Sequence, residues 1–220
     1  MILIKALDWI FTRKSNHIMH FWARLWGKLL IWTSPVWTLK TDGLENYDRK
    51  KTFVVVVNHQ SMMDIFVLLA GLKLNFKFLS KKEVFSIPLI GWHMKHTGYI
   101  RLDRGSAESA RAAMASAREW LKKGESIVFF PEGTRSDDGQ MLPFKAGAFR
   151  LAQELEVPVL PVVIDGTGDA LPKNSWRLLK LCKFRLSAGK PVLIPKDANV
   201  HESLRAIQQG MADRLEKMRS

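Results

Sequence analysis

Four consecutive valines at residues 54–57 constrain the fold of this chain more than any other feature. β-Branched side chains favour extended backbone, and a short apolar run without polar alternation predicts a strand buried on both faces. Residues 62–71 then form an apolar segment of helical length, with Ser61 at the expected N-cap position. A buried strand that is followed directly by a helix is typical of a parallel sheet covered by helices.

The same alternation continues along the 220 residues and predicts one α/β domain, with a largely parallel central sheet flanked by helices. We assign this domain to residues 41–220, and an appendage of amphipathic helices to residues 1–40. Besides residues 54–57, strands are expected at residues 36–41, 76–80, 98–102, 126–130, 157–164 and 183–188, the last one half-exposed. Further helices are expected at residues 106–123, 146–155 and 204–218.

Two polar residues follow the valine run, His59 and Asp64. Open α/β sheets bind their ligands at the carboxyl ends of strands. If His59 lies on the turn and Asp64 in the first helical turn, the carboxylate can orient the imidazole and leave one ring nitrogen to take a proton. The alternative is structural, because Ser61 and Asp64 also resemble a capping box, and Asp in a first turn favours the helix dipole.

A second polar turn follows the buried strand expected at residues 126–130. Pro131 ends this strand, Gly133 permits a tight turn whose N–H groups can bind an anion, and Arg135 has a guanidinium suited to phosphate. The alternative is that Glu132 and Arg135 form a surface ion pair beside an ordinary loop. Two polar turns at strand ends together favour a functional site.

These turns belong to four blocks, residues 58–64, 98–104, 130–135 and 157–163. In order, spacing and content the blocks resemble the lysophosphatidic acid acyltransferases, the 1-acyl-sn-glycerol-3-phosphate acyltransferases of the glycerolipid acyltransferase superfamily. Residues 81–92 and 144–147 also look like this family. The resemblance implies acyl transfer from acyl-CoA or an acyl carrier protein thioester to the sn-2 hydroxyl of lysophosphatidic acid, giving phosphatidic acid, with no metal and no bound cofactor. Ornithine lipids, lysophospholipids and glycerol 3-phosphate stay open as acceptors.

The resemblance also implies a role for individual residues of these blocks. His59 would be the general base that removes the proton from the acceptor hydroxyl, and Asp64 would orient it. Pro161 would contact the acyl donor or shape the pocket. The phosphorylated acceptor would be bound by Lys81 (or its neighbour Lys82), Arg101, Arg104, Glu132, Gly133, Thr134 and Arg135.

The composition points to anionic partners, since the formal net charge is +13. An anionic phospholipid membrane is the expected partner, and nucleic acid is the rival from another class. Against nucleic acid, the sequence has no zinc-ligand spacing and no RNA-binding aromatic signature, and its basic residues are dispersed. The single cysteine excludes an internal disulfide and fits a reducing compartment.

The first forty residues contain five of the eight tryptophans, and from residue 18 the apolar positions follow helical spacing. The longest uncharged run, residues 29–39, falls well short of the roughly 18 to 20 residues that cross a bilayer, and no cleavable signal pattern is present. We therefore expect a peripheral (monotopic) membrane protein at the cytoplasmic face, with packing of the stripe on the protein's own core as the alternative. The expected membrane-binding residues are Trp9, Trp22, Arg24, Trp26, Lys28 and Trp32.

Overall fold

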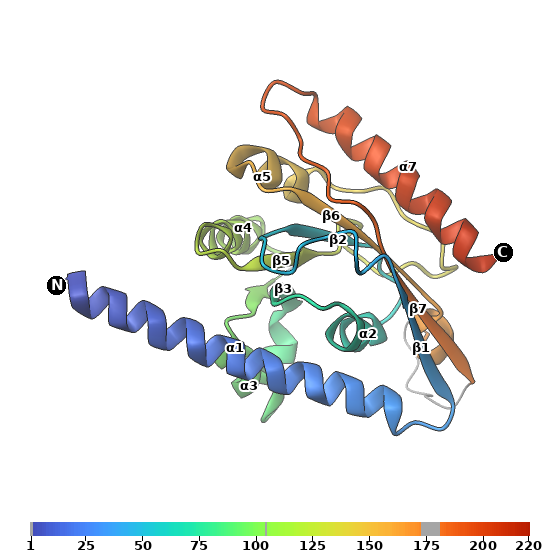
Figure 1. Ribbon diagram of the computed structural model, residues 1–220, viewed down its shortest axis with the longest axis horizontal. Helices are drawn as coiled ribbons and strands as arrows, with labels where there is room; N and C mark the ends of the chain where they lie inside the picture. Colours follow the sequence, from blue (N-terminus) through green and yellow to red (C-terminus); the bar gives the residue numbers. More distant parts are fainter. Residues whose placement is uncertain (1, 104, 173–180) are drawn as a thin grey trace.

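The computed structural model describes residues 2–103, 105–172 and 181–220, with side chains from residue 17 onward (Figure 1). Within these ranges the strands form one sheet with the order β1-β7-β6-β2-β5-β3-β4. The strands are β1 (Trp37–Asp42), β2 (Val54–Val57), β3 (Phe76–Lys81), β4 (Ile100–Leu102), β5 (Ser126–Phe129), β6 (Val159–Asp165) and β7 (Cys182–Ala188).

The five strands β6, β2, β5, β3 and β4 are parallel, which confirms the predicted α/β fold with a largely parallel sheet. Each predicted strand is present, within two residues at either end. The sequence did not indicate the direction of the last strand. β7 pairs antiparallel with β6, and β1 pairs parallel with β7, so these two strands run opposite to the rest.

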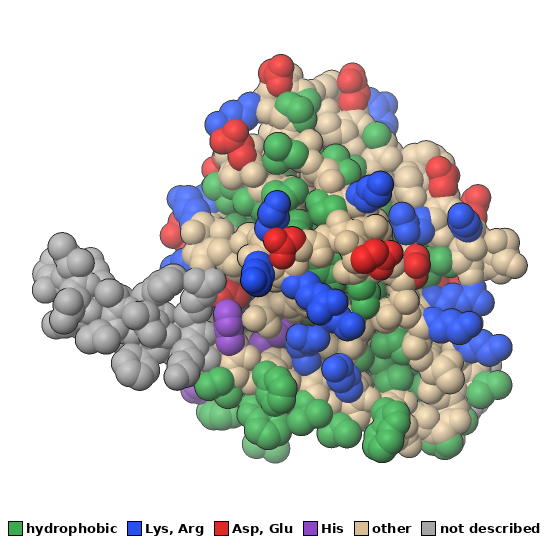
Figure 2. Space-filling model, viewed as in Figure 1, with side chains coloured by type: hydrophobic (Ala, Val, Ile, Leu, Met, Phe, Trp, Pro, Cys, Tyr) green, Lys and Arg blue, Asp and Glu red, His purple; other side chains and the backbone are tan. Residues whose placement is uncertain are grey.

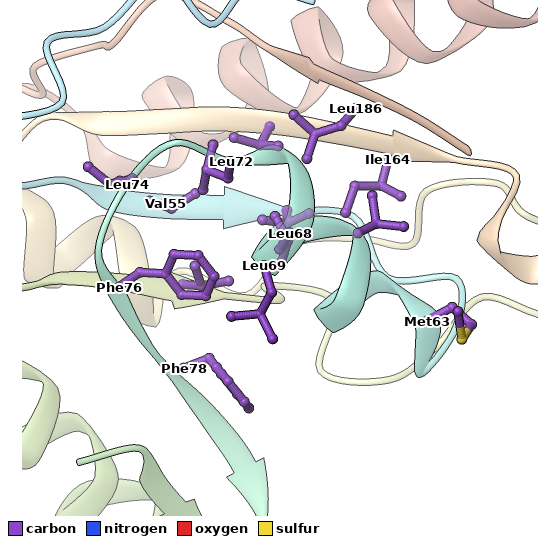
Figure 3. Packing of buried hydrophobic residues seen from close by; sticks show 14 of the residues in the cluster. Val55, Met63, Leu68, Leu69, Leu72, Leu74, Phe76, Phe78, Ile164 and Leu186 are labelled. Carbon is purple, nitrogen blue, oxygen red and sulfur yellow. The ribbon is translucent and has the colours of Figure 1, made fainter. Parts of the chain in front are cut away.

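Helices cover both faces of the sheet. Val55 and Val57 belong to the core beneath α2 (Met63–Gly71), whereas Val54 and Val56 belong to the core beneath α4 (Ala107–Lys122), α5 (Gly147–Leu155) and α7 (Val200–Arg219). The valine run is therefore buried on both faces, as predicted. Figure 3 shows Leu68 of α2 and Leu72, the residue that follows this helix, packed over the sheet. The helices are α1 (Ile2–Trp32), α2 (Met63–Gly71), the 3₁₀ helix η1 (Lys82–Ser86), α3 (Ile90–Thr97), α4 (Ala107–Lys122), α5 (Gly147–Leu155), α6 (Thr167–Ala170) and α7 (Val200–Arg219).

α1 is one long helix that runs along the α2 and α3 side of the domain (Figure 1). Its docked face is narrow and includes the buried residues His20, Ala23 and Ile31. At Gly27 the backbones nearly touch, because an added Cβ would lie 3.0 Å from the Cβ of Leu69. Among the described residues, no helix combines the length and apolar character needed to cross a membrane.

A tight contact also fixes the junction between η1 and α3, two elements that the sequence did not predict as helical. An added Cβ on Gly91 would lie 2.0 Å from the carbonyl oxygen of Phe85, a backbone atom that has no room to yield. Only glycine therefore fits at the start of α3.

We predict that Gly91→Ala lowers the free energy of unfolding by about 1–3 kcal/mol, the usual cost of overpacking. Gly210→Ala is the matched control, because Gly210 is also helical and has no atom within 4 Å of an added Cβ. The control should gain about 0.5–1 kcal/mol from the lower entropy of the unfolded chain. Chemical denaturation of both variants in detergent measures the difference, and equal effects would contradict the packing at Gly91.

Candidate active site

The turn between β2 and α2 is held against β6 by Asn58, whose side-chain amide makes two hydrogen bonds to the backbone of β6, as a neighbouring strand would. The side-chain nitrogen donates to the carbonyl of Ile164 at 2.8 Å, and the side-chain oxygen accepts from the N–H of Ile164 at 2.8 Å. α2 begins at Met63, one residue later than predicted. The N-cap position is therefore Met62, and the prediction of Ser61 as N-cap is wrong by one residue. The hydroxyl oxygen of Ser61 still accepts from the N–H of Met63, the first residue of the helix, at 3.2 Å.

His59 and Asp64 meet as the sequence predicts, with His59 on the turn and Asp64 in the first turn of α2. Nδ1 of His59 lies 2.7 Å from Oδ2 of Asp64, and both side chains are buried. Since the carboxylate accepts the Nδ1–H proton, Nε2 is the ring nitrogen left to take a proton. The imidazole also stacks on Phe130, with ring centroids 4.1 Å apart.

Asp64 is fully buried, and several donors compensate the loss of its hydration. Its Oδ2 also accepts from the backbone N–H groups of Gln60 at 2.8 Å and Ser61 at 3.0 Å. Its Oδ1 accepts from the hydroxyl of Thr167 at 2.5 Å. The same carboxylate therefore shapes the turn and orients the imidazole.

Thr167 is a site residue that the sequence reasoning missed. It is fully buried at the start of α6, directly after β6, and none of the four blocks contains it. The only available signal was Gly166, which has a φ of +85° and turns the chain back toward the sheet edge. A threonine after one glycine is too common a pattern to indicate a contact with Asp64.

The loop after β5 encloses the backbone of His59 on two sides. Oε1 of Glu132 accepts from the N–H of His59 at 2.7 Å, and the N–H of Ser136 donates to the carbonyl of His59 at 2.8 Å. Oε2 of Glu132 accepts from the N–H of Leu142 at 3.0 Å. Glu132 is buried and turned inward, so the structure shows it holding the loop to the turn. Its expected contact with the acceptor stays a prediction.

Burial raises the pKa of Glu132 to about 7. The two backbone N–H groups favour the carboxylate and oppose this shift, whereas the negative charge of Asp64 adds to it.

Gly133, Thr134 and Arg135 continue this loop. Gly133 has a φ of +76°, which confirms the predicted tight turn. The side chain of Lys145 lies across it, since an added Cβ on Gly133 would be 2.7 Å from Nζ of Lys145. Lys145 belongs to the segment 144–147 that resembles the family, but no pattern in the sequence indicates that its ammonium lies at this turn.

The remaining expected ligands lie farther along the sheet. Neighbouring strands are about 4.8 Å apart, which places β3 with Lys81 roughly 10 Å from β2, and β4 with Arg101 roughly 14 Å away. Lys82 forms an ion pair with Asp103 at 2.5 Å, which leaves Lys81 as the better candidate of the two. Pro161 of β6 pairs with Val56 of β2 inside the sheet. Val56 precedes His59 by three residues, roughly 10 Å of extended chain, so Pro161 does not reach the sheet edge where His59 lies. Arg104 lies outside the described residues.

Comparisons with known proteins identify the family of this chain. A sequence model of the family described as Acyltransferase matches residues 38–165. The crystal structure of the 1-acyl-sn-glycerophosphate (LPA) acyltransferase PlsC from Thermotoga maritima superposes with a TM-score of 0.82 at 32% identity, over 94% of this chain and 83% of that one. The chain belongs to the lysophosphatidic acid acyltransferase family. The resemblance seen in the four blocks is thereby confirmed.

Curated members of this acyltransferase family share the same region. The 1-acyl-sn-glycerol-3-phosphate acyltransferases BAT2 (chloroplastic) of Brassica napus and LPAT1 (chloroplastic) of Arabidopsis thaliana are 41% and 42% identical over 184 and 193 residues, which is 83% and 87% of this chain. The chain spans about half the length of these relatives, 53% of each. The family match ends at residue 165, so Thr167 lies just beyond it.

Because the folded-state pKa of Glu132 lies above its ordinary value of 4.5, protonation of this carboxyl favours the folded state. Its stabilising contribution is complete below pH 4.5 and is lost as the pH rises through about 7. Glu132→Gln cannot titrate, so we predict that the stability advantage of the wild type over this variant shrinks across that range. Chemical denaturation at a series of pH values measures it. An advantage that grows with pH would mean that the two N–H groups outweigh burial.

Proposed function

We propose that this chain transfers a fatty acyl group from a thioester, acyl-CoA or an acyl carrier protein, to the sn-2 hydroxyl of lysophosphatidic acid, giving phosphatidic acid. The observation that carries the proposal is the 2.7 Å bond between His59 Nδ1 and Asp64 Oδ2 at the carboxyl edge of the sheet. Relatives that are named for this reaction support it. Both donor classes offer the same thioester carbonyl, and the chemistry requires no metal or bound cofactor.

The proposed reaction is a direct transfer between the two substrates. Nε2 of His59 takes the proton from the acceptor hydroxyl as its oxygen attacks the thioester carbonyl. The tetrahedral intermediate then collapses, the C–S bond breaks, and the imidazolium returns its proton to the leaving thiolate. The products are the ester and a free thiol, so no acyl-enzyme forms. Asp64 holds the ring in the reactive tautomer and stabilises the imidazolium between the two steps.

The phosphate of the acceptor would bind to cations beside this pair. Arg135 is the first candidate, because it lies on the loop that encloses His59. We add Lys145, whose ammonium lies over the Gly133 turn. Lys81 and Arg101 belong to strands farther along the edge, and they suit an acceptor whose phosphate extends away from the hydroxyl. Arg104 is proposed as a ligand from the family resemblance alone. Pro161, which lies inside the sheet, would act on the donor only by shaping the pocket.

The exposed face of α1 supports a location on the membrane surface. Trp22, Trp26 and Trp32 are 57%, 48% and 82% exposed, so much of the apolar stripe faces solvent, although the ring of Trp26 also contacts Phe66 of α2 edge to face. Tryptophan rings of this kind bind at the level of the lipid headgroups, and exposed Lys28 adds attraction to anionic lipid. Arg24 is half-buried, and its Nε is buried without a hydrogen-bond partner among the described residues, which makes it the weaker of the two cations.

This arrangement corresponds to a monotopic protein that rests on the cytoplasmic face of its membrane. Trp9 would extend the same contact, although its side chain lies outside the described part of α1. Anionic phospholipid, lysophosphatidic acid and the acyl thioester are then the partners, with no role for nucleic acid. A basic protein that binds membrane or nucleic acid without catalysis is the competing class.

One assay separates these classes and identifies the acceptor. Purified protein in detergent is given acyl-CoA or an acyl carrier protein thioester together with lysophosphatidic acid, an ornithine lipid, a lysophospholipid or glycerol 3-phosphate. We predict the highest kcat/KM for lysophosphatidic acid, and a loss in kcat of about 100-fold or more in a folded His59→Ala variant. Asp64→Asn should also lose most of its turnover. Normal turnover by folded His59→Ala would exclude the mechanism, and lipid or nucleic acid binding without any acyl transfer would favour the competing class.

Thr167 allows a finer test of how Asp64 is held. Thr167→Val keeps the shape of the side chain and removes the hydroxyl that donates to Asp64. A hydrogen bond to a charged group contributes about 1.5–3 kcal/mol, so we predict roughly a tenfold or larger loss in kcat with little change in KM. Thr167→Ser keeps the donor and should recover most of the rate. A loss in Thr167→Ser together with normal turnover in Thr167→Val would show that packing of the methyl group matters, and not the hydrogen bond.

A further inference from the structure

The turn between η1 and α3 presents three large apolar side chains to solvent. Ile87, Leu89 and Trp92 are 44%, 82% and 58% exposed, within six residues of sequence. We call residues 87–92 the η1–α3 tip. Single exposed apolar residues are common on protein surfaces, but a group of three on one short turn marks an interaction site.

The backbone of the η1–α3 tip is strained in a way that keeps Leu89 exposed. Leu89 has φ +62° and ψ −48°, and the N–H of Ile90 donates to the carbonyl of Pro88 at 2.7 Å. This is a γ-turn with a positive φ, a rare conformation that glycine adopts more readily than leucine. In the free protein, both the backbone strain at Leu89 and the exposure of its apolar side chain therefore raise the free energy. Burial of its side chain by a partner would offset the second cost.

The η1–α3 tip is also anchored, so its apolar side chains are held outward. The N–H of Gly91 donates to the carbonyl of Ile87 at 2.8 Å, and the N–H of His93 donates to the carbonyl of Leu89 at 2.9 Å. Gly91 itself is seated against the backbone of Phe85. A rigid apolar projection suits insertion into another phase better than folding back onto its own surface.

The η1–α3 tip continues the exposed face of α1. α3 packs against α1, and Figure 2 shows hydrophobic side chains gathered along the lower edge of the molecule, where Figure 1 places both helices. The exposed apolar side chains of α1 include Phe21, Trp22, Trp26 and Trp32. Lys28 and Lys95 are exposed on the same two helices. Apolar groups beside cations complement the acyl chains and headgroups of an anionic bilayer.

We propose that the η1–α3 tip is a second membrane contact, which inserts Ile87, Leu89 and Trp92 into the lipid interface beside α1. The proposal rests on the membrane location given above for the acyltransferase. A single interfacial helix leaves the protein free to rotate about the helix axis, whereas a second contact on another element fixes its orientation. α2, which carries Asp64, packs on α1, so a fixed orientation also sets how the catalytic edge faces the lipid surface.

The test measures partitioning of the full chain onto vesicles of phosphatidylcholine with phosphatidylglycerol. The tip variant combines Ile87→Ser, Leu89→Gly and Trp92→Ser, and should bind at least about tenfold more weakly, since each lost apolar side chain removes buried area. The matched control is Leu193→Ser, which removes an apolar side chain of similar exposure, 57%, from the loop before α7. The control should bind like the wild type. A third variant, Trp22→Ser with Trp26→Ser, tests α1 separately.

The outcomes separate this proposal from the proposed function. Weaker binding of the tip variant with an unchanged Leu193→Ser control supports the proposal. Wild-type binding by the tip variant overturns it, and would turn attention to a protein partner for the tip. If Leu193→Ser weakens binding equally, any exposed apolar side chain contributes to non-specific binding, and the proposal is also overturned. Turnover of a short-chain, dispersed acceptor should stay unchanged in the tip variant. If the wild type does not turn over this acceptor, the result counts against the proposed function alone.

The single variant Leu89→Gly guards against a folding artefact. Because glycine relieves the strained turn, its melting temperature should equal or exceed that of the wild type while its vesicle affinity falls. A purely structural role of Leu89 would not combine an equal or higher melting temperature with a lower vesicle affinity. A lower melting temperature together with unchanged affinity would show that Leu89 supports the fold, and would overturn the proposal.

Discussion

The buried carboxylate of Asp64 is the group on which the rest of the site depends. A carboxylate removed from water is costly unless donors replace its hydration shell. Here the donors are the imidazole of His59, the backbone N–H groups of Gln60 and Ser61, and the hydroxyl of Thr167. Two of them are backbone groups, so the turn closes around the carboxylate, and the same contact orients the imidazole. Local folding and placement of the proposed base therefore have one cause.

The sheet supplies the position of this turn. The valines of β2 are buried on both faces, so the strand has little freedom to shift. The Asn58 amide then continues the pairing with Ile164 beyond the end of β2, and Glu132 joins the neighbouring loop to the backbone of His59. Parallel strands bring these loops to the same edge even though they lie far apart in sequence. The proposed chemistry thus rests on apolar packing that no substrate contacts.

Patterns within one segment predicted most of the fold, because a buried strand or an amphipathic helix is a local property. The meeting of His59 and Asp64 was also predictable, since both lie on one strand–turn–helix unit. Contacts between distant segments were not. Thr167 donates to Asp64 from beyond the end of β6, and Glu132 accepts from the backbone of His59. β7 runs antiparallel to β6. Each of these features depends on the assembled sheet. The strained turn at Leu89 was hidden for another reason, because leucine does not signal a positive φ.

The central claim is that Asp64 holds the neutral imidazole of His59 with its proton on Nδ1 and with Nε2 free to accept another. Nitrogen-15 NMR of the full chain with labelled histidine tests this most directly, because the two ring nitrogens differ in chemical shift according to which one carries the proton. A His59→Gln variant assigns the signals. At a pH where the ring is neutral, the predicted result is a protonated Nδ1 and an unprotonated Nε2 in the wild type, with this preference lost in Asp64→Asn. A proton on Nε2 of the neutral ring in the wild type would contradict the account.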